Sequence, residues 1–137
     1  MIADRLGNGQ GLASTYSLAA LLAATAQVGR PYLEILRVEA LSVGVYELAA
    51  GDEDRQQPHG EDEIYVVARG TARITIGDEV VDVAPGAVVY VPARVPHRFH
   101  DIREDLFLIV VFAPPEGTVT EGALTAPGPP GSGAPTP

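Results

Sequence analysis

Cysteine is absent from this chain of 137 residues, so disulfides, thiolate metal ligands and cysteine nucleophiles are all excluded. Aromatic residues are few, at 6%, whereas the chain has 15 Gly and 12 Pro. This balance favours many short strands joined by tight turns over a bundle of helices. Apolar residues reach 46%, which is enough for a hydrophobic core, and the length fits a single domain.

Basic residues are also scarce, at 9 against 18 acidic residues, which gives a formal net charge of −9. The acidic residues cluster at 52–54, 61–63, 78–79 and 104–105. Such a surface repels phosphate backbones and anionic membranes, so we expect no nucleic-acid partner and no membrane partner. The sequence holds no apolar run long enough to span a bilayer. We therefore expect a cytoplasmic protein.

The apolar stretch Leu18–Ala26 has two interpretations. It could be the apolar region of a signal peptide that is cleaved after the small residues at 24–26, which makes secretion a minor alternative. However, the segment before it is Gly-rich and contains Asp4 as well as Arg5, so it lacks the expected positive charge. The leucines of the stretch also recur at helical spacing. We therefore expect a short helix over 15–28 that packs on the rest of the fold.

Strand signals follow the helix at regular spacing. The expected strands are Tyr32–Ala40, Leu41–Ala50, Glu63–Arg69, Thr71–Ile76, Glu79–Val83, Ala87–Val91, His97–Asp101 and Leu106–Phe112. Turn signals such as Gly77-Asp78 and Pro85-Gly86 separate them. About eight short strands in this arrangement are typical of an all-β sandwich or barrel.

The last expected strand, Leu106–Phe112, lacks polar alternation. Such a strand is buried on both faces, here against the N-terminal helix or against a second subunit. A two-fold symmetric interface would cover the apolar surface of so small a barrel, so we expect a homodimer.

The two ends of the chain differ in composition from its centre. Residues 1–14 are Gly-rich and read as a flexible lead, and residues 15–113 form the expected domain. Seven of the twelve prolines lie in residues 114–137, mixed with Gly, Ala, Thr and Ser. This segment has too little apolar surface to offset its ordering entropy, so we predict a disordered tail over 114–137.

Candidate ligands for a metal interrupt the strands. Gln57, His59 and Glu63 lie at even separations, which places them on one side of a continuous strand. A turn at 60–62 would instead put Glu63 on the adjoining strand. His97 follows much later and could complete the cluster across a closed barrel. Two imidazoles and a carboxylate are a recurrent ligand set for iron, manganese, nickel or zinc. The alternative is that His59 belongs to an acidic loop and His97 caps a strand.

Two motifs add a family context. The first reads Gly, five residues, His-x-His, three or four residues, Glu, six residues, Gly; the second reads Gly, five residues, Pro-x-Gly, two residues, His, three residues, Asn. The chain matches their spacings with Gly51, Gln57, His59, Glu63 and Gly70, and then with Gly86, Pro92, Arg94, His97 and Asp101. Gln57 stands in a His place, Arg94 in the Gly place and Asp101 in the Asn place. Over residues 32–113 the chain thus resembles the cupin superfamily, in particular its small single-domain members.

This resemblance implies a small double-stranded β-helix, or jelly roll, with one divalent transition metal at its centre. His59, Glu63 and His97 would hold the metal, whether iron, manganese, zinc or nickel. Gln57 is a neutral and weaker ligand than imidazole, so the resemblance also implies a lower metal affinity than that of a three-His cupin.

Four further residues are candidates for the substrate pocket. Tyr65 and Phe99 share the parity of Glu63 and His97, so they line the pocket or fill the barrel. Tyr90 is a weaker pocket candidate. Arg94 could meet an anionic substrate group at the barrel mouth, or it could pair with a surface acid.

Two classes of function follow from the resemblance. One is a metalloenzyme that acts on a small organic substrate in the barrel, either dioxygenase-like or isomerase- or lyase-like. The alternative is a non-catalytic cupin that binds or senses a small molecule. The same ligands serve all these activities, so the motif does not choose between them.

Overall fold

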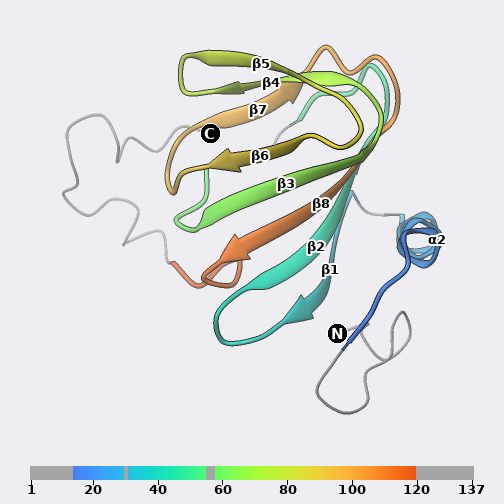
Figure 1. Ribbon diagram of the computed structural model, residues 1–137, viewed down its shortest axis with the longest axis vertical. Helices are drawn as coiled ribbons and strands as arrows, with labels where there is room; N and C mark the ends of the chain where they lie inside the picture. Colours follow the sequence, from blue (N-terminus) through green and yellow to red (C-terminus); the bar gives the residue numbers. More distant parts are fainter. Residues whose placement is uncertain (1–13, 30, 55–57, 120–137) are drawn as a thin grey trace.

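The computed structural model describes residues 14–29, 31–54 and 58–119. Two antiparallel sheets face each other, and one helix lies outside them (Figure 1). The elements are helix α2, Leu18–Val28, and the strands β1, Tyr32–Arg37; β2, Ser42–Leu48; β3, Asp62–Arg69; β4, Ala72–Ile76; β5, Glu79–Val83; β6, Val88–Val91; β7, His97–His100; and β8, Leu106–Ala113. The predicted all-β jelly roll with a short N-terminal helix is confirmed.

The larger sheet has the order β1-β2-β8-β3-β6, and the smaller has the order β5-β4-β7. Alternation along β3 sets which side chains enter the space between the sheets: Glu63, Tyr65 and Val67 are buried, whereas Ile64 is exposed. The main core fills this space with apolar side chains from both sheets. Glu63 is therefore a carboxylate on the inner face of a hydrophobic barrel.

Glycines close the turns between strands. Gly70, between β3 and β4, has φ of 92°, and a Cβ there would collide with the backbone carbonyl of Asp105. Only glycine satisfies both requirements. The other glycines of the two family motifs, Gly51 and Gly86, also have positive φ. The motif glycines thus mark the sharp turns of the barrel.

Helix α2 begins after Ser17, whose Oγ accepts a hydrogen bond of 3.1 Å from the N–H of Ala20. It ends at Gly29, whose N–H donates to the carbonyl of Thr25. The sequence predicted its start at 15, three residues earlier, because Ser17 was not recognised as the cap. None of the described helices is long and apolar enough to cross a membrane.

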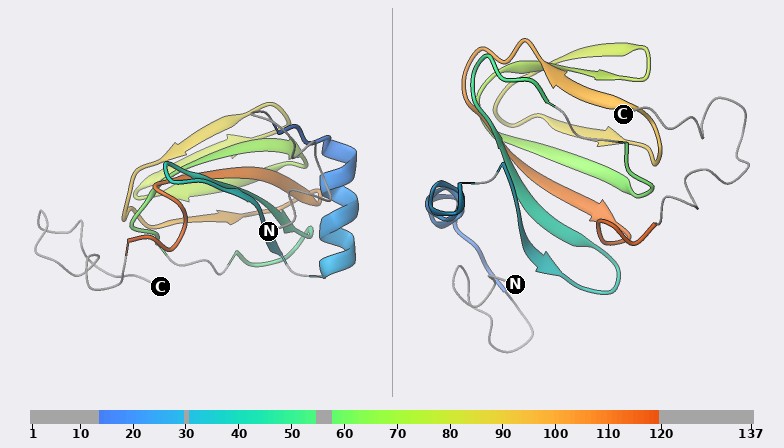
Figure 2. Two further views of the ribbon diagram at one scale, coloured as in Figure 1. Left: turned by 90° about the horizontal axis from the view of Figure 1, so that it is seen from below. Right: turned by 180° about the vertical axis from the view of Figure 1, so that it is seen from behind.

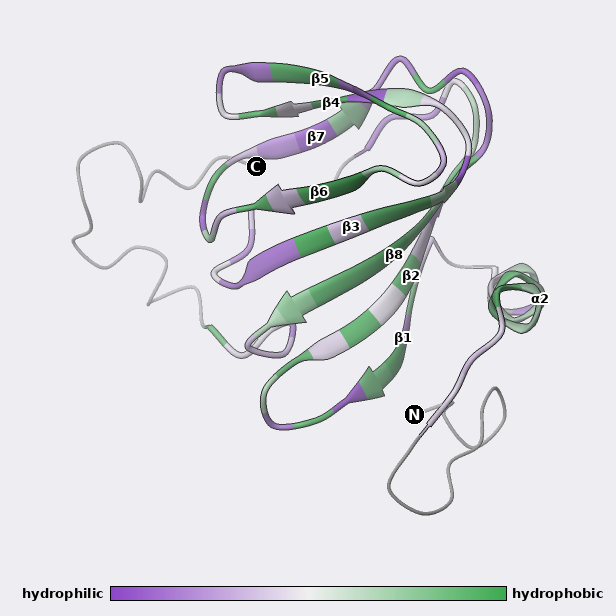
Figure 3. Cartoon of the chain, in the orientation of Figure 1, coloured by the Kyte–Doolittle hydropathy of each residue, from purple (hydrophilic) through white to green (hydrophobic). Residues whose placement is uncertain are grey.

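The helix covers part of the outer face of the larger sheet (Figures 1 and 2). Leu21 of α2 packs with Leu33 and Ile35 of β1, Val45 of β2 and Phe107 of β8 in a second apolar cluster. Strand β8 is hydrophobic along its length (Figure 3), and the main core and this cluster together bury most of it. The sequence predicted that β8 packs against the helix or against a second subunit, and the helix covers Phe107.

An apolar patch remains on the outer face beyond the helix. Ile64 of β3 pairs in register with Tyr90 of β6, and Val88 of β6 lies opposite Val66 of β3. Their exposed fractions are 38% for Ile64, 56% for Tyr90 and 68% for Val88. We call these three residues the β3–β6 patch.

After β8 the chain turns across the end of the barrel. The N–H of Glu116 donates to Oγ of Ser42 (2.8 Å), and Nη2 of Arg37 donates to the Glu116 carbonyl (2.8 Å). The N–H of Val119 donates to Oε2 of the buried Glu61 (2.9 Å). The described structure thus continues six residues beyond the predicted boundary at 113. The rest of the predicted tail and the lead 1–13 lie outside the described residues, so the domain limits stay predictions.

Candidate functional site

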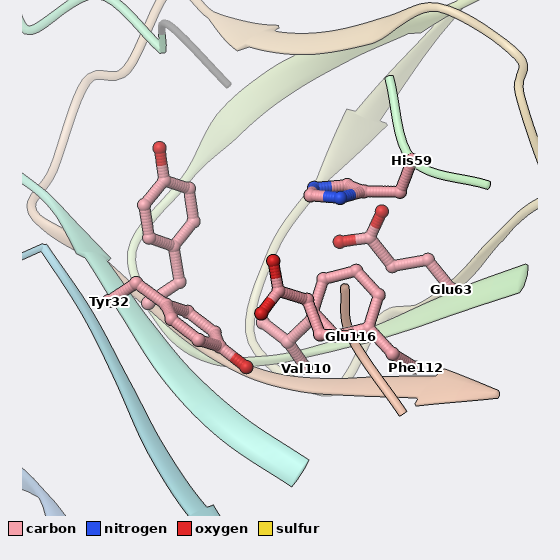
Figure 4. A pocket seen from close by; sticks show the side chains of 7 residues that line it. Tyr32, His59, Glu63, Val110, Phe112 and Glu116 are labelled. Atoms are coloured by element: carbon pink, nitrogen blue, oxygen red, sulfur yellow. The ribbon is translucent and has the colours of Figure 1, made fainter. Parts of the chain in front are cut away.

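A cavity of about 170 Å³ lies at one end of the barrel. It is lined by Tyr32, Tyr46, His59, Glu63, Val110, Phe112 and Glu116 (Figure 4). These side chains come from β1, β2, β3 and β8, from the loop before β3 and from the segment after β8. The larger sheet and its two flanking segments therefore build the cavity.

Glu63 is 1% exposed, and its carboxylate points into the cavity below the ring of His59 (Figure 4). Its Oε1 lies 3.0 Å from Nε2 of His97. Apart from this contact with His97, neither carboxylate oxygen has a hydrogen-bond donor within the described structure. A buried carboxylate is costly unless a cation or several donors balance it. Glu63 therefore lacks the full set of partners that its burial requires.

His97 opens β7 and is held from both sides of its ring. Nδ1 lies 3.0 Å from the carbonyl of Val95, and Nε2 lies 3.1 Å from the hydroxyl of Tyr65. Burial by itself would lower the pKa of His97, but the hydrogen bond and negative charge of Glu63 outweigh it, so the pKa of His97 is raised. The Nδ1 contact orients Nε2 toward Glu63, which is the arrangement of a metal-ligating histidine fixed by its other nitrogen.

His59 lies in the loop that leads into β3. Its ring packs edge-on against Phe112, with centroids 4.8 Å apart, and its centroid is 6.4 Å from that of His97. Nδ1 lies 3.9 Å from Oε1 of Glu61. The backbone of His59 is fixed because its carbonyl accepts a 2.6 Å hydrogen bond from the N–H of Arg94.

The fold thus brings His59, Glu63 and His97 to one end of the barrel, from three separate segments. Within the ranges that the structure describes, His, Asp and Glu side chains do not converge in threes around one point. The fourth predicted ligand, Gln57, lies outside the described residues. The carboxylate of Glu63 lies 3.0 Å from the imidazole of His97 and below the ring of His59 (Figure 4), and a carboxylate with two imidazoles is a donor set that divalent transition metals use.

The pocket candidates Tyr65 and Phe99 lie in the core. Both are 0% exposed, and their rings pack edge to face with centroids 4.9 Å apart. Neither lines the cavity, although the Tyr65 hydroxyl contacts His97. Tyr65 thus contacts the candidate ligand His97 from the core, and Phe99 fills the core.

The other two candidates, Tyr90 and Arg94, also lie outside the cavity lining. Tyr90 is on the outer face of β6, where its hydroxyl donates to Asp62 (3.1 Å). Arg94 is half-buried, and its Nε has no hydrogen-bond partner within the described structure. The other substituted position of the second motif, Asp101, contacts Arg73 (3.7 Å) and His100 (3.2 Å).

Two tyrosines that line the cavity were missed from sequence. Tyr32 and Tyr46 pair in register on β1 and β2 and share the inner face. Tyr32 lies over Gly44, where a Cβ would collide with the phenol ring. Its buried hydroxyl has no hydrogen-bond partner in the described structure, whereas the Tyr46 hydroxyl donates to Asp54 (2.8 Å). Strand parity could have identified both tyrosines.

The environment of the two phenols is apolar and negative. Burial raises the pKa of Tyr32, and the charges of Glu116, Glu34 and Glu63 add to this effect. Burial also raises the pKa of Tyr46, together with the charge and hydrogen bond of Asp54. Both side chains therefore stay neutral phenols over the physiological range.

A family model described as a cupin domain matches residues 44–112, slightly more than half of the chain. The chain belongs to the cupin family. The uncharacterized protein SCO3923 of Streptomyces coelicolor is 56% identical to this cupin over 85 residues, which cover 62% of this chain and 81% of that protein.

Solved structures share the fold of this cupin. The protein TT1209 from Thermus thermophilus has a TM-score of 0.56 and 27% identity, over 61% of this chain and 82% of that one. The DMSP lyase DddQ from Ruegeria pomeroyi has a TM-score of 0.52 and 23% identity, over 56% of this chain and 39% of that one. The second likeness is one of fold alone.

The second motif of this cupin departs from the family at two strained positions. Arg94 has φ of 68° and Asp101 has φ of 50°, and no other non-glycine residue within the described ranges has a positive φ. These are the places where the motif carries Gly and Asn, the two residues that adopt this conformation most readily. The backbone requirement has therefore been kept although the residues have changed.

Proposed function

We propose that this cupin binds one divalent transition metal through His59, Glu63 and His97, and that it is a metalloenzyme for a small organic substrate. The observation that carries the proposal is Glu63, a fully buried carboxylate that contacts His97 and has no other hydrogen-bond donor in the described structure. A divalent cation would balance this charge. Gln57 would be a further, weaker ligand.

A bound metal with open positions would supply Lewis-acid or oxygen-activating chemistry. The protein's own residues prepare the place for it. The Val95 carbonyl and the Tyr65 hydroxyl orient the His97 ring, and the Arg94 N–H fixes the backbone of His59. Iron would favour oxygenation, whereas zinc or manganese would favour isomerisation or lyase chemistry.

A non-catalytic cupin that holds a small molecule is the second candidate. The observation in its favour is that the described ligand candidates do not converge around one point. In that case the cavity, and not a metal, would be the functional element.

Elemental analysis of protein purified without a metal-affinity column tests the proposal. We expect about one equivalent of a transition metal in the unmodified protein and none in His97→Ala, with the fold retained by circular dichroism. His100→Ala is the matched control, because His100 contacts Thr75 and Asp101 on the outer face of the smaller sheet. Gln57→His should raise the metal affinity, since imidazole is the stronger ligand.

Full metal occupancy in His97→Ala would show that the proposed site is wrong. Absence of metal from the unmodified protein, even after incubation with iron, manganese, nickel and zinc, would favour the binding protein over the metalloenzyme.

A further inference from the structure

Two carboxylates, those of Glu63 and Glu116, line the cavity. Glu63 contacts His97, at 3.0 Å, whereas Glu116 has no cationic side chain among the described residues that line the cavity beside it. Within the described structure Glu116 is held through its backbone, whose N–H contacts Ser42 and whose carbonyl contacts Arg37, and its carboxylate faces the cavity (Figure 4). His59 is the one described lining residue that can become cationic, and its Nδ1 faces Glu61. A ligand that enters this space meets a negative field.

Aromatic rings line the same cavity as the two carboxylates. Tyr32 packs edge-on with Tyr46 and with Phe112, at centroid distances of 6.4 and 6.2 Å. The carboxylate of Glu116 lies near the Tyr32 hydroxyl (Figure 4), and its charge adds to the effect of burial in raising the pKa of Tyr32. Ring faces attract cations, most strongly where water is excluded.

Tyr32 and His59 lie on opposite sides of the cavity. Figure 4 shows the carboxylate of Glu116 between them, close to the carboxylate of Glu63 as well as to the Tyr32 hydroxyl. The volume of about 170 Å³ is close to that of cavities that hold a benzene-sized molecule, roughly 150 Å³. A ligand of about choline's size therefore fits the cavity.

We propose that the cavity binds a small organic cation, such as a quaternary ammonium, with its charged group against Tyr32 and Phe112 and paired with Glu116. The inference deepens the proposed function, because it names the ligand class for the same cavity. A cation would pair with the Glu116 carboxylate, whereas an anion would be repelled by both carboxylates.

Isothermal titration with three probes of matched shape tests the inference: choline, the neutral 3,3-dimethylbutan-1-ol and the anion 3,3-dimethylbutanoate. We expect choline to bind at least about tenfold more tightly than the alcohol, and the anion not to bind. Glu116→Gln keeps the backbone contacts and should weaken choline binding about fivefold or more. Glu79→Gln removes the same charge from the exposed start of β5 and should change nothing.

A second pair of variants separates the ring from the hydroxyl. Tyr32→Phe should keep choline binding, because the ring face is retained, whereas Tyr32→Leu should lose most of it. Circular dichroism checks that each variant is folded. Equal binding of choline and the alcohol, tighter binding of the anion, or unchanged choline affinity in Glu116→Gln would each overturn the inference.

The same samples are assayed for metal, and the titrations are run on metal-free and on zinc-loaded protein. Metal binding without choline binding would leave the proposed metal site standing and remove this inference. Choline binding to a protein that takes up no metal would support this inference and remove the proposed metal site.

Discussion

Arg94 holds a backbone conformation that opposes its side chain. A left-handed residue with a Cβ costs about 1–2 kcal/mol, whereas the extra chain entropy of glycine costs about 0.5–1 kcal/mol. With φ of 68°, Arg94→Gly should therefore raise the free energy of unfolding, by up to about 1 kcal/mol. It also removes a buried Nε that has no hydrogen-bond partner in the described chain.

Urea denaturation measures this difference. Arg98→Gly is the matched control, because Arg98 lies within β7 and glycine weakens a strand. Arg98→Gly should lower the stability. A loss of stability in Arg94→Gly as large as that in the control would contradict the strain argument.

Tyr46 links the stability of the barrel to alkaline pH. Its pKa is raised in the folded state by burial and by Asp54, so the folded protein holds this proton more tightly than the unfolded chain does. The contribution is fully present below the unfolded pKa of about 10 and is lost as the pH rises toward the folded value. We expect the free energy of unfolding to fall above about pH 10.

Tyr46→Phe removes that proton and leaves Asp54 without the Tyr46 donor. The variant should be less stable at pH 7 by about 1–3 kcal/mol, and its stability should fall less steeply above pH 10. Guanidinium denaturation from pH 7 to 11 measures both effects. Parallel pH profiles for the two proteins would contradict the assignment.

Single residues were predictable where a motif or a fixed spacing marked them. His59, Glu63 and His97 were found because their offsets repeat a known pattern, and the fold brings them to one end of the barrel. Glu116 gave no such signal, since it lies among prolines after the last strand and reaches the cavity only through contacts with Ser42 and Arg37. Tertiary contacts of this kind have no local pattern.

At the scale of elements, α2 depends on its packing. A helix of 11 residues is marginal in water on its own, so the contacts of Leu21 with the larger sheet keep it in place. Leu21→Ala should lower the free energy of unfolding by about 2–5 kcal/mol. Leu18→Ala, at a position that is 40% exposed, should cost much less. Urea denaturation followed by circular dichroism compares the two, and equal losses would argue against this role for Leu21.

The strands were predictable in number and order because short extended runs alternate with strong turn signals. The end of β1 and the start of β2 were harder to predict. The sequence predicted strands to 40 and from 41, whereas β1 ends at Arg37 and β2 begins at Ser42. Val38 and Leu41 have strand-like side chains but form a turn in which the Val38 N–H donates to the Leu41 carbonyl (3.0 Å). Apolar side chains in a turn are not distinguishable locally from those in a strand.

For the whole molecule we predict a homodimer formed through the β3–β6 patch. The sequence placed the interface on Leu106–Phe112, but α2 covers Phe107, and the exposed large apolar side chains of the larger sheet lie on β3 and β6. Val88→Arg should give a monomeric mass by light scattering at micromolar concentration, because an unpaired charge would enter the interface. Val80→Arg, on β5, should not change the mass. A monomeric mass for the unmodified protein would rule the dimer out.

The cavity is lined by residues from inside and from outside the range that matches the family model. The candidate metal ligands His59 and Glu63 lie within residues 44–112, which match the family model, but Tyr32 and Glu116 lie before and after that range. The two flanks are therefore the parts of the cavity that the family model does not specify. In a chimaera that exchanges only these flanks between two cupins, ligand preference should travel with the exchanged ends and metal chemistry should stay with the barrel.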